Sequence, residues 1–166
     1  MTMLQHTGIS TVLAAGLWFL TGPWAAASCL AAGVLVDLDH LVDYILNYPR
    51  RGFHLHHFFY AFKVEVLNRV FVFLHAWELV GATWMAAWWS GWHPALLGTA
   101  IGLGAHLFMD QIFNAHTPAA YLLSYRIRHR FDGRRFYGNR EIERRRAITN
   151  PQTEAKGKAF TSKADR

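Results

Sequence analysis

Histidines and carboxylates occur together, one helical turn apart, in the apolar part of this 166-residue chain. Residues three or four positions apart share a face of a helix, so such a pair can direct two donors to one point between helices. Burying a charge in lipid is costly, and ionisable groups in apolar segments are therefore usually functional. Three pairs predict one metal site inside a helical bundle: Asp37 with His40, His75 with Glu78, and His106 with Asp110.

Two neighbours enlarge the expected ligand set. His6 stands at the start of the first apolar segment, and Asp39 points to a different side of its helix from Asp37. Asp39 can bridge a second ion, or it can orient His40 through a hydrogen bond. The full set of expected metal ligands is His6, Asp37, Asp39, His40, His75, Glu78, His106 and Asp110.

The donor types indicate which metals would bind. Imidazole and carboxylate donors without a thiolate are typical of zinc, manganese or iron sites. One catalytic zinc needs only three or four donors, so this set is large enough for about one to three ions. A pair of ions about 4 Å apart polarises a phosphoryl oxygen and activates water. The pattern therefore favours a metal-dependent hydrolase, with zinc as the first choice of metal.

Four apolar segments must position these residues, at about 8–22, 24–46, 64–90 and 95–125. A helix that crosses a bilayer needs about 20 apolar residues, and the last three segments reach that length. The first segment is shorter, and we expect it to be tilted or only partly inserted. The sequence thus predicts an all-α polytopic membrane bundle with about four transmembrane helices.

Basic residues gather on one side of these segments. The turns at 22–23 and 91–94 carry no Lys or Arg, whereas an arginine cluster follows the fourth segment. Lys and Arg favour cytoplasmic loops, so we expect both termini and the metal site in the cytoplasmic half of a bacterial inner membrane. The other basic residues of this side flank the connection between the second and third segments: Arg50, Arg51, Lys63 and Arg69.

This charge distribution divides the chain into a transmembrane, hydrolase-like domain at 1–125 and a basic cytoplasmic tail at 126–166. The net charge of +6 comes mostly from the tail. Basic residues beside a hydrophobic segment bind anionic lipid headgroups, and we expect this partner rather than nucleic acid. The polar end beyond Thr149 is expected to be disordered.

Each pair also has a structural interpretation. A His and an Asp four residues apart often only hydrogen-bond to each other, and Asp37 with His40 can mark the interfacial end of a helix. For the whole chain, the main alternative is a membrane protein that binds or transports a metal ion or protons without hydrolysis. The lack of an internal repeat argues against transport. A third interpretation is a scaffold with a structural metal, whose site would be coordinatively closed.

Taken in order, His6, Asp37-x-Asp39-His40 and His106-x-x-x-Asp110 resemble the motifs of predicted membrane-bound metal-dependent hydrolases. That family is related to zinc-dependent phospholipase C and to zinc-dependent single-strand nucleases. The resemblance covers roughly residues 5–116, and it implies an all-helical fold with a multi-zinc site that cleaves phosphodiesters. His116 extends the likeness to the phospholipase branch.

The chain also departs from that family. Val36 stands where the family usually has proline before its Asp-x-Asp-His. The stretch from Arg50 to His56 keeps Arg-Gly but lacks the first His and the Thr-His-Ser of the usual motif. His75 and Glu78 are the candidates to replace a ligand from that stretch.

The expected reaction is hydrolysis of a phosphoester in a lipid, because the site would open toward the inner leaflet. Glu78 and Asp39 are the expected catalytic carboxylates, and Glu78→Gln is expected to abolish turnover. Metal-activated water is the simplest nucleophile, since no Ser or Cys lies among the ligands. The expected headgroup contacts are Arg50, Arg51 and His54.

Overall fold

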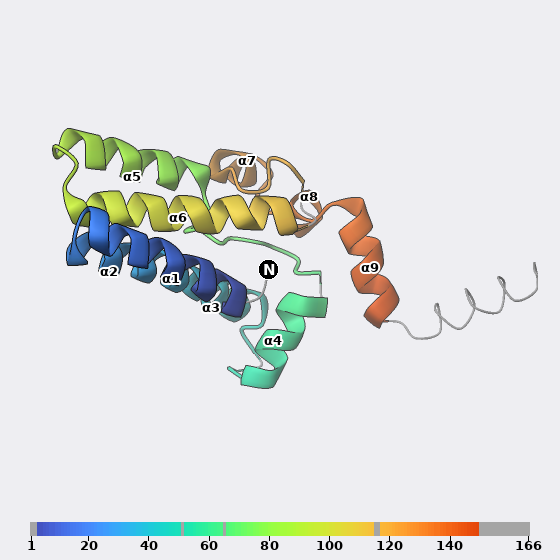
Figure 1. The fold of residues 1–166 in the computed structure, drawn as a ribbon. Helices are drawn as coiled ribbons and strands as arrows, with labels where there is room; N and C mark the ends of the chain where they lie inside the picture. Colours follow the sequence, from blue (N-terminus) through green and yellow to red (C-terminus); the bar gives the residue numbers. More distant parts are fainter. Residues whose placement is uncertain (1–2, 51, 65, 115–116, 150–166) are drawn as a thin grey trace, which may run out of the picture.

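The computed structural model of the protein describes residues 3–50, 52–64, 66–114 and 117–149, and within these residues every regular element is a helix (Figure 1). The predicted all-α fold is therefore confirmed. In chain order the elements are α1 (Met3–Leu20), α2 (Pro23–Leu35), the 3₁₀ turn η1 (Val36–Leu38), α3 (Asp39–Asn47), α4 (Leu55–Val64), α5 (Trp77–Trp89), α6 (Pro94–Phe113), α7 (Leu123–Arg128), α8 (Gly133–Phe136) and α9 (Asn139–Thr149).

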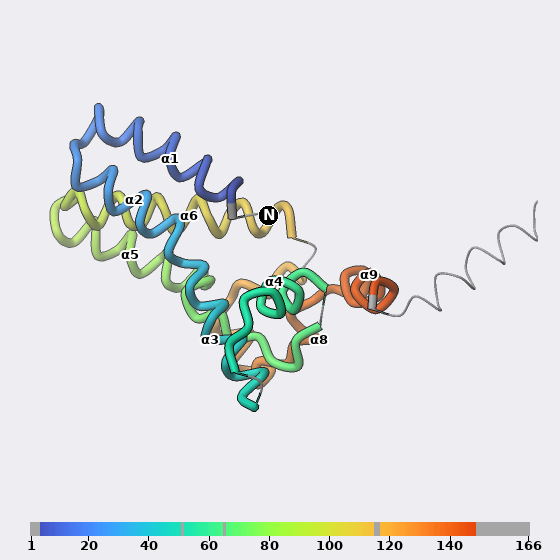
Figure 2. Tube along the Cα trace, turned by 90° about the horizontal axis from the view of Figure 1, so that it is seen from below, coloured from blue at the N-terminus to red at the C-terminus, as the bar shows by residue number. Residues whose placement is uncertain are grey.

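Helices α1, α2, α5 and α6 run alongside one another as a bundle (Figures 1 and 2). At one end the chain reverses through two tight turns, where Gly22 and Gly91 adopt positive φ angles of 103° and 68°. Glycine adopts such angles readily because it has no Cβ. Pro23 and Pro94 then occupy the first turns of α2 and α6, where proline costs no helical hydrogen bond. The smaller helices gather at the opposite end, together with the start of α1.

Among the described residues, two helices are long and apolar enough to cross a membrane, Pro23–Asn47 (α2, η1 and α3 in continuous succession) and Pro94–Phe113 (α6). The sequence predicted a third long segment at 64–90, but α5 begins only at Trp77 and has 13 residues. At 1.5 Å per residue this is about 20 Å, which is shorter than the hydrocarbon core of a bilayer. The fourth segment likewise ends its helix at Phe113 rather than near residue 125.

Glycines let α2 and α6 pack backbone to backbone. Gly98 and Gly102 lie one turn apart on α6. A Cβ on Gly98 would collide with the carbonyl oxygen of Ala25, and one on Gly102 with that of Cys29. Small residues at this spacing allow helices to approach closely. His106 lies on the same face of α6, four residues after Gly102. The close contact between α2 and α6 therefore determines where His106 lies.

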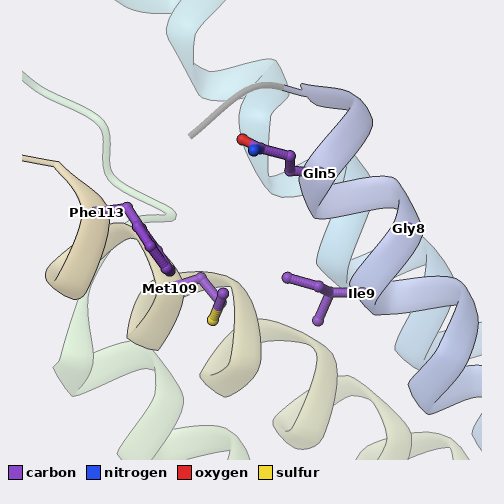
Figure 3. Close-up of a pocket in the computed structure, with 5 residues that line it drawn as sticks. All are labelled: Gln5, Gly8, Ile9, Met109 and Phe113. Atoms are coloured by element: carbon purple, nitrogen blue, oxygen red, sulfur yellow. The ribbon is translucent and has the colours of Figure 1, made fainter.

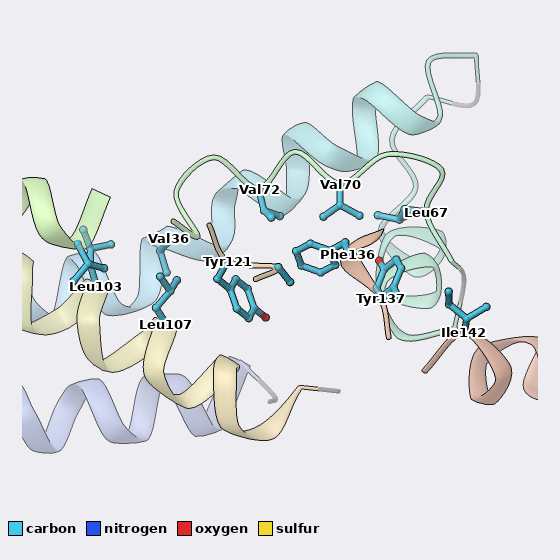
Figure 4. Close-up of a cluster of buried hydrophobic side chains, with 12 residues drawn as sticks. Val36, Leu67, Val70, Val72, Leu103, Leu107, Tyr121, Phe136, Tyr137 and Ile142 are labelled. Carbon is cyan, nitrogen blue, oxygen red and sulfur yellow. The ribbon is translucent and has the colours of Figure 1, made fainter. Parts of the chain in front are cut away.

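Buried apolar side chains connect the bundle to the chain that follows it (Figure 4). The cluster begins with Val36 and Leu107 between the long helices and extends to Phe136, Tyr137 and Ile142. Residues on both sides of position 125 thus pack in one cluster, and the division into two domains stays a prediction. The predicted disorder beyond Thr149 concerns residues outside the described part of the chain.

Candidate metal centre

His106 and Asp110 lie on one face of α6, as their four-residue spacing predicted, and both are buried. The Nδ1 atom of His106 is 2.8 Å from the carbonyl oxygen of Gly33 on α2. Because a carbonyl oxygen only accepts hydrogen bonds, Nδ1 carries the proton and donates it. In the neutral form that ligates a metal, the ring of His106 therefore has its lone pair on Nε2.

Asp37 belongs to the 3₁₀ turn η1, where the long helix Pro23–Asn47 tightens for three residues. Its Oδ1 atom is 3.4 Å from Nε2 of His106 and also 3.4 Å from Nε2 of His75. A 3₁₀ stretch within a longer helix often marks a functional position. Here it places one carboxylate oxygen between two imidazoles.

His75 reaches the same point from a segment without regular structure. Its side chain is 1% exposed, and its Nδ1 atom is 3.1 Å from the carboxylate of Asp39. Asp39 also accepts a hydrogen bond of 2.9 Å from the amide of Leu74. Asp39 therefore orients a histidine, as one prediction had it, but that histidine is His75 rather than His40. With Nδ1 held by Asp39, Nε2 of His75 lies 3.2 Å from Nε2 of His106.

Four donor atoms thus converge from three parts of the chain. The Oδ2 atom of Asp110 completes the group, 3.6 Å from Nε2 of His75 and 3.5 Å from Nε2 of His106. We call these atoms the central donor group: Asp37 Oδ1, His75 Nε2, His106 Nε2 and Asp110 Oδ2. Three overlapping groups among the described residues could each hold a metal ion: His6, His106 and Asp110; Asp37, His75 and His106; and Asp39, His40 and His75.

Further donors flank the central donor group on two sides. On one side, Nε2 of His6 is 3.1 Å from Oδ1 of Asp110, and the ring of His6 stacks on that of His106 with centroids 3.9 Å apart. On the other side, Nε2 of His40 is 3.7 Å from Oδ1 of Asp37, and the two imidazoles of His40 and His75 lie 4.9 Å apart. The structure therefore brings seven of the eight predicted ligands together.

Exposure differs across the cluster. The side chains of His75 and His106 are 1% and 0% exposed, whereas those of Asp37 and His40 are 15% and 32% exposed. Solvent therefore reaches the cluster past Asp37 and His40.

Comparison with models of known families, with curated proteins and with solved structures gives no match for this chain. The resemblance to membrane-bound hydrolases therefore rests on its sequence motifs, and the geometry of the cluster is the physical ground for a function.

The charge state of His75 follows from its surroundings. Burial alone would lower the pKa of His75, but hydrogen bonds to Asp37 and Asp39 outweigh this and raise it to about 10. Without a metal, the ring therefore carries a proton on both nitrogens at neutral pH. A metal ion must displace the Nε2 proton to bind there.

Glu78, predicted as both ligand and catalytic residue, lies outside the cluster. The helix α5 begins at Trp77, so His75 precedes the helix and shares no helical face with Glu78. The carboxylate instead accepts hydrogen bonds of 2.8 and 2.9 Å from the amides of Leu123 and Ser124. Partial burial would raise the pKa of Glu78, but these hydrogen bonds lower it to about 2. Glu78 thus caps the start of α7, and we remove it from the ligand set.

The variant Glu78→Gln should therefore keep its bound metal, contrary to the sequence-based expectation that this change abolishes turnover. It should lose about 1 kcal/mol of stability, because a neutral amide is a weaker partner for the first amides of a helix. Thermal unfolding and elemental analysis of the purified variant test both points. Loss of metal with unchanged stability would return Glu78 to the site.

The predicted headgroup contacts lie at the surface. Arg50 is exposed in the turn after α3, and His54 is exposed in the chain just before α4. Both stand outside the buried cluster, and Arg51 lies outside the described residues. His116 also lies outside them. A role for these residues in binding a substrate stays a prediction.

Two residues that the sequence did not single out hold the segment that carries His75. Oδ1 of Asp43 accepts hydrogen bonds of 2.8 and 3.2 Å from the amides of Phe71 and Val72. Arg126 is 2% exposed and donates to the carbonyl oxygens of Phe71, Val72 and His75, the last at 2.7 Å. These bonds replace helical hydrogen bonds, which explains why the predicted long helix does not form here.

We expect Arg126→Met to lower the stability of the protein by about 2 kcal/mol, because buried carbonyl oxygens lose charged donors. It should also weaken metal binding, since His75 loses the contact that fixes its backbone. Arg126→Lys should recover part of both losses. The control is Arg128→Met, because Arg128 is exposed on the same short helix. Equal metal affinity in Arg126→Met and Arg128→Met would contradict this role.

Proposed function

We propose that the protein is a membrane-bound, metal-dependent hydrolase that acts on a phosphoester, with zinc as its metal. The observation that carries the proposal is the spacing within the central donor group. In a tetrahedral zinc site with bonds of 2.0–2.2 Å, neighbouring donors are about 3.3–3.6 Å apart. The five separations given above lie between 3.2 and 3.6 Å. Two imidazoles and two carboxylates at this spacing fit zinc, and manganese and iron take the same donor types.

Charge balance also supports a bound cation. Asp37, Asp39 and Asp110 are gathered within one largely buried cluster. Like charges repel each other strongly when water is excluded, and without a metal the protonated ring of His75 offsets this repulsion only in part. A divalent ion would offset this repulsion. The pairs His6 with Asp110 and His40 with Asp37 offer donors for a second ion on either side.

Hydrolysis is favoured over a purely structural metal site by the uneven exposure of the cluster. A bound divalent ion would act as a Lewis acid on a phosphoryl oxygen and lower the pKa of a water molecule. Asp39 would keep the ring of His75 in place through Nδ1. His40, the most exposed imidazole of the cluster, would face the incoming water or substrate. The buried side, formed by His75 and His106, excludes bulk water.

The arrangement of charge supports a membrane topology for this enzyme. Arg50, Lys63 and Arg69 and the arginines of α7–α9 belong to the end of the bundle where α1 starts and α6 finishes (Figure 1). The two turns at the other end carry no Lys or Arg. By the positive-inside rule, the basic end faces the cytoplasm, with the metal cluster near the inner leaflet. In this proposal α1 and α5 complete a four-helix bundle in a bacterial inner membrane.

The proposal is tested with zinc-loaded protein in detergent, a chromogenic phosphodiester and fluorescent phospholipids. Activity should require zinc, disappear on chelation and return when zinc is added back. Asp110→Asn should remove it, whereas Glu78→Gln serves as a carboxylate-to-amide control that keeps it. Zinc-loaded protein without activity on any phosphoester, but with zinc crossing vesicle membranes, would instead favour transport.

Zinc binding should release at least one proton per chain at neutral pH, because His75 must lose its Nε2 proton. Since its pKa is raised to about 10, the apparent zinc affinity should fall as the pH is lowered toward neutrality and below. A pH indicator in weakly buffered detergent solution measures the release. Zinc binding without proton release would mean that His75 is not a ligand.

A further inference from the structure

A groove lies between α1 and α6 (Figure 3). It has a volume of about 590 Å³, which is in the range of small-molecule sites. The walls are apolar except for one amide side chain. Its lining residues are Gln5, Gly8, Ile9, Met109 and Phe113.

Both walls of the groove contain residues that are next to cluster residues in the chain. On α1, Gln5 immediately precedes His6, and on α6, Met109 immediately precedes Asp110. His6 and Asp110 are themselves in contact, with Nε2 and Oδ1 3.1 Å apart. On each helix a groove residue is thus the chain neighbour of one member of the His6–Asp110 pair, and the two buried donors stand behind the apolar walls.

The surface around the groove is also apolar and open to the outside. Leu4 on α1 is 82% exposed, and Ile112 and Phe113 on α6 are 57% and 62% exposed. Because α6 is one of the helices able to cross a membrane, this surface would meet lipid rather than water. A ligand in the groove would thus enter sideways from the bilayer.

We propose that the groove binds the hydrocarbon chain of a lipid phosphoester whose phosphate group lies at the metal cluster. The inference rests on the proposed function and gives its substrate class. Apolar walls match an alkyl chain, and the cluster with its divalent ion matches the anionic phosphate. A water-soluble phosphoester would leave the apolar walls unused.

Gly8 provides a sharp test. Among the described residues, a Cβ on Gly8 would meet no atom within 4 Å, and the same holds for Gly16 on the same helix. Gly8→Trp would therefore fill the groove without displacing the protein, whereas Gly16→Trp adds the same side chain to α1 away from the groove. Met109→Trp fills the groove from the opposite wall and replaces Gly8→Trp if that variant does not fold.

The experiment uses the full chain, zinc-loaded and reconstituted in phosphatidylcholine vesicles. The probes are a diacylglycerol phosphonate with a photoreactive diazirine in its acyl chain and the same diacylglycerol without the phosphonate. We expect the phosphonate probe to label residues 5–9 and 109–113 about tenfold more than its partner does, since only it is held at both ends. Chelation and Gly8→Trp should each remove this preference, and Gly16→Trp should keep it.

Equal labelling by both probes, or a preference that survives Gly8→Trp, would overturn the proposal. Zinc content is measured in every preparation, which separates the two ideas. A chain that binds zinc but shows no groove preference contradicts the lipid-chain site alone. A chain that binds no zinc contradicts the proposed function itself.

Discussion

His106→Ala should weaken zinc binding by at least about a hundredfold, the largest effect of any single change, because His106 supplies one of four converging donors. The substitution also breaks the bond from Nδ1 to Gly33 that aligns α6 with α2. Competition with a chromogenic zinc chelator measures the affinity.

His93→Ala is the matched control, since His93 precedes α6 in the far turn and is exposed. Because His106→Ala also leaves a buried cavity, Asp110→Asn provides a second variant of nearly unchanged volume. Both cluster variants should lose zinc while the control keeps it. Wild-type affinity in both would show that zinc, if bound, lies elsewhere.

Gly98→Ala combined with Gly102→Ala should lower the stability of the protein by about 4 kcal/mol, since each added methyl group overpacks a backbone contact. Each Cβ would collide with a carbonyl oxygen of α2, so the two helices must move apart. Zinc binding should weaken as well, because His106 follows on the same face. Thermal unfolding in detergent, with and without zinc, measures both effects.

Gly81→Ala is the control for this prediction. Gly81 lies within α5, and among the described residues a Cβ there would meet no atom within 4 Å. Gly81→Ala should therefore raise the stability of the protein by about 0.5–1 kcal/mol, because alanine favours helix more than glycine does. Destabilisation of similar size at both positions would mean that glycine flexibility, rather than close packing, explains the first result.

Site residues that lie within one regular helix could be predicted from the sequence. His106 and Asp110 lie within one unbroken helix, so their spacing gave their common face correctly. Asp37 and Asp39 lie where the helix tightens, and both contact His75 from there. The pairing of His75 with Glu78 was wrong because the helix begins between them, at Trp77. Glu78 lies in the first turn of α5, and its carboxylate instead caps the start of α7.

The rest of the site depends on contacts between distant parts of the chain. Arg126 holds the His75 segment across more than fifty residues, and Asp43 does so across 28 or more. Their partners are backbone groups, which have no sequence signature. By contrast, the Gly98–Gly102 spacing is visible in the sequence and is a known signal for close helix packing. It could have placed α6 against α2.

The central claim is that Asp37, His75, His106 and Asp110 hold zinc. X-ray absorption at the zinc edge, on wild-type protein purified without chelator, tests it most directly. We expect at least one zinc per chain, surrounded by nitrogen and oxygen at about 2.0–2.2 Å with the scattering pattern of imidazole. No bound metal after reconstitution with zinc, or a zinc shell without imidazole, would contradict the account.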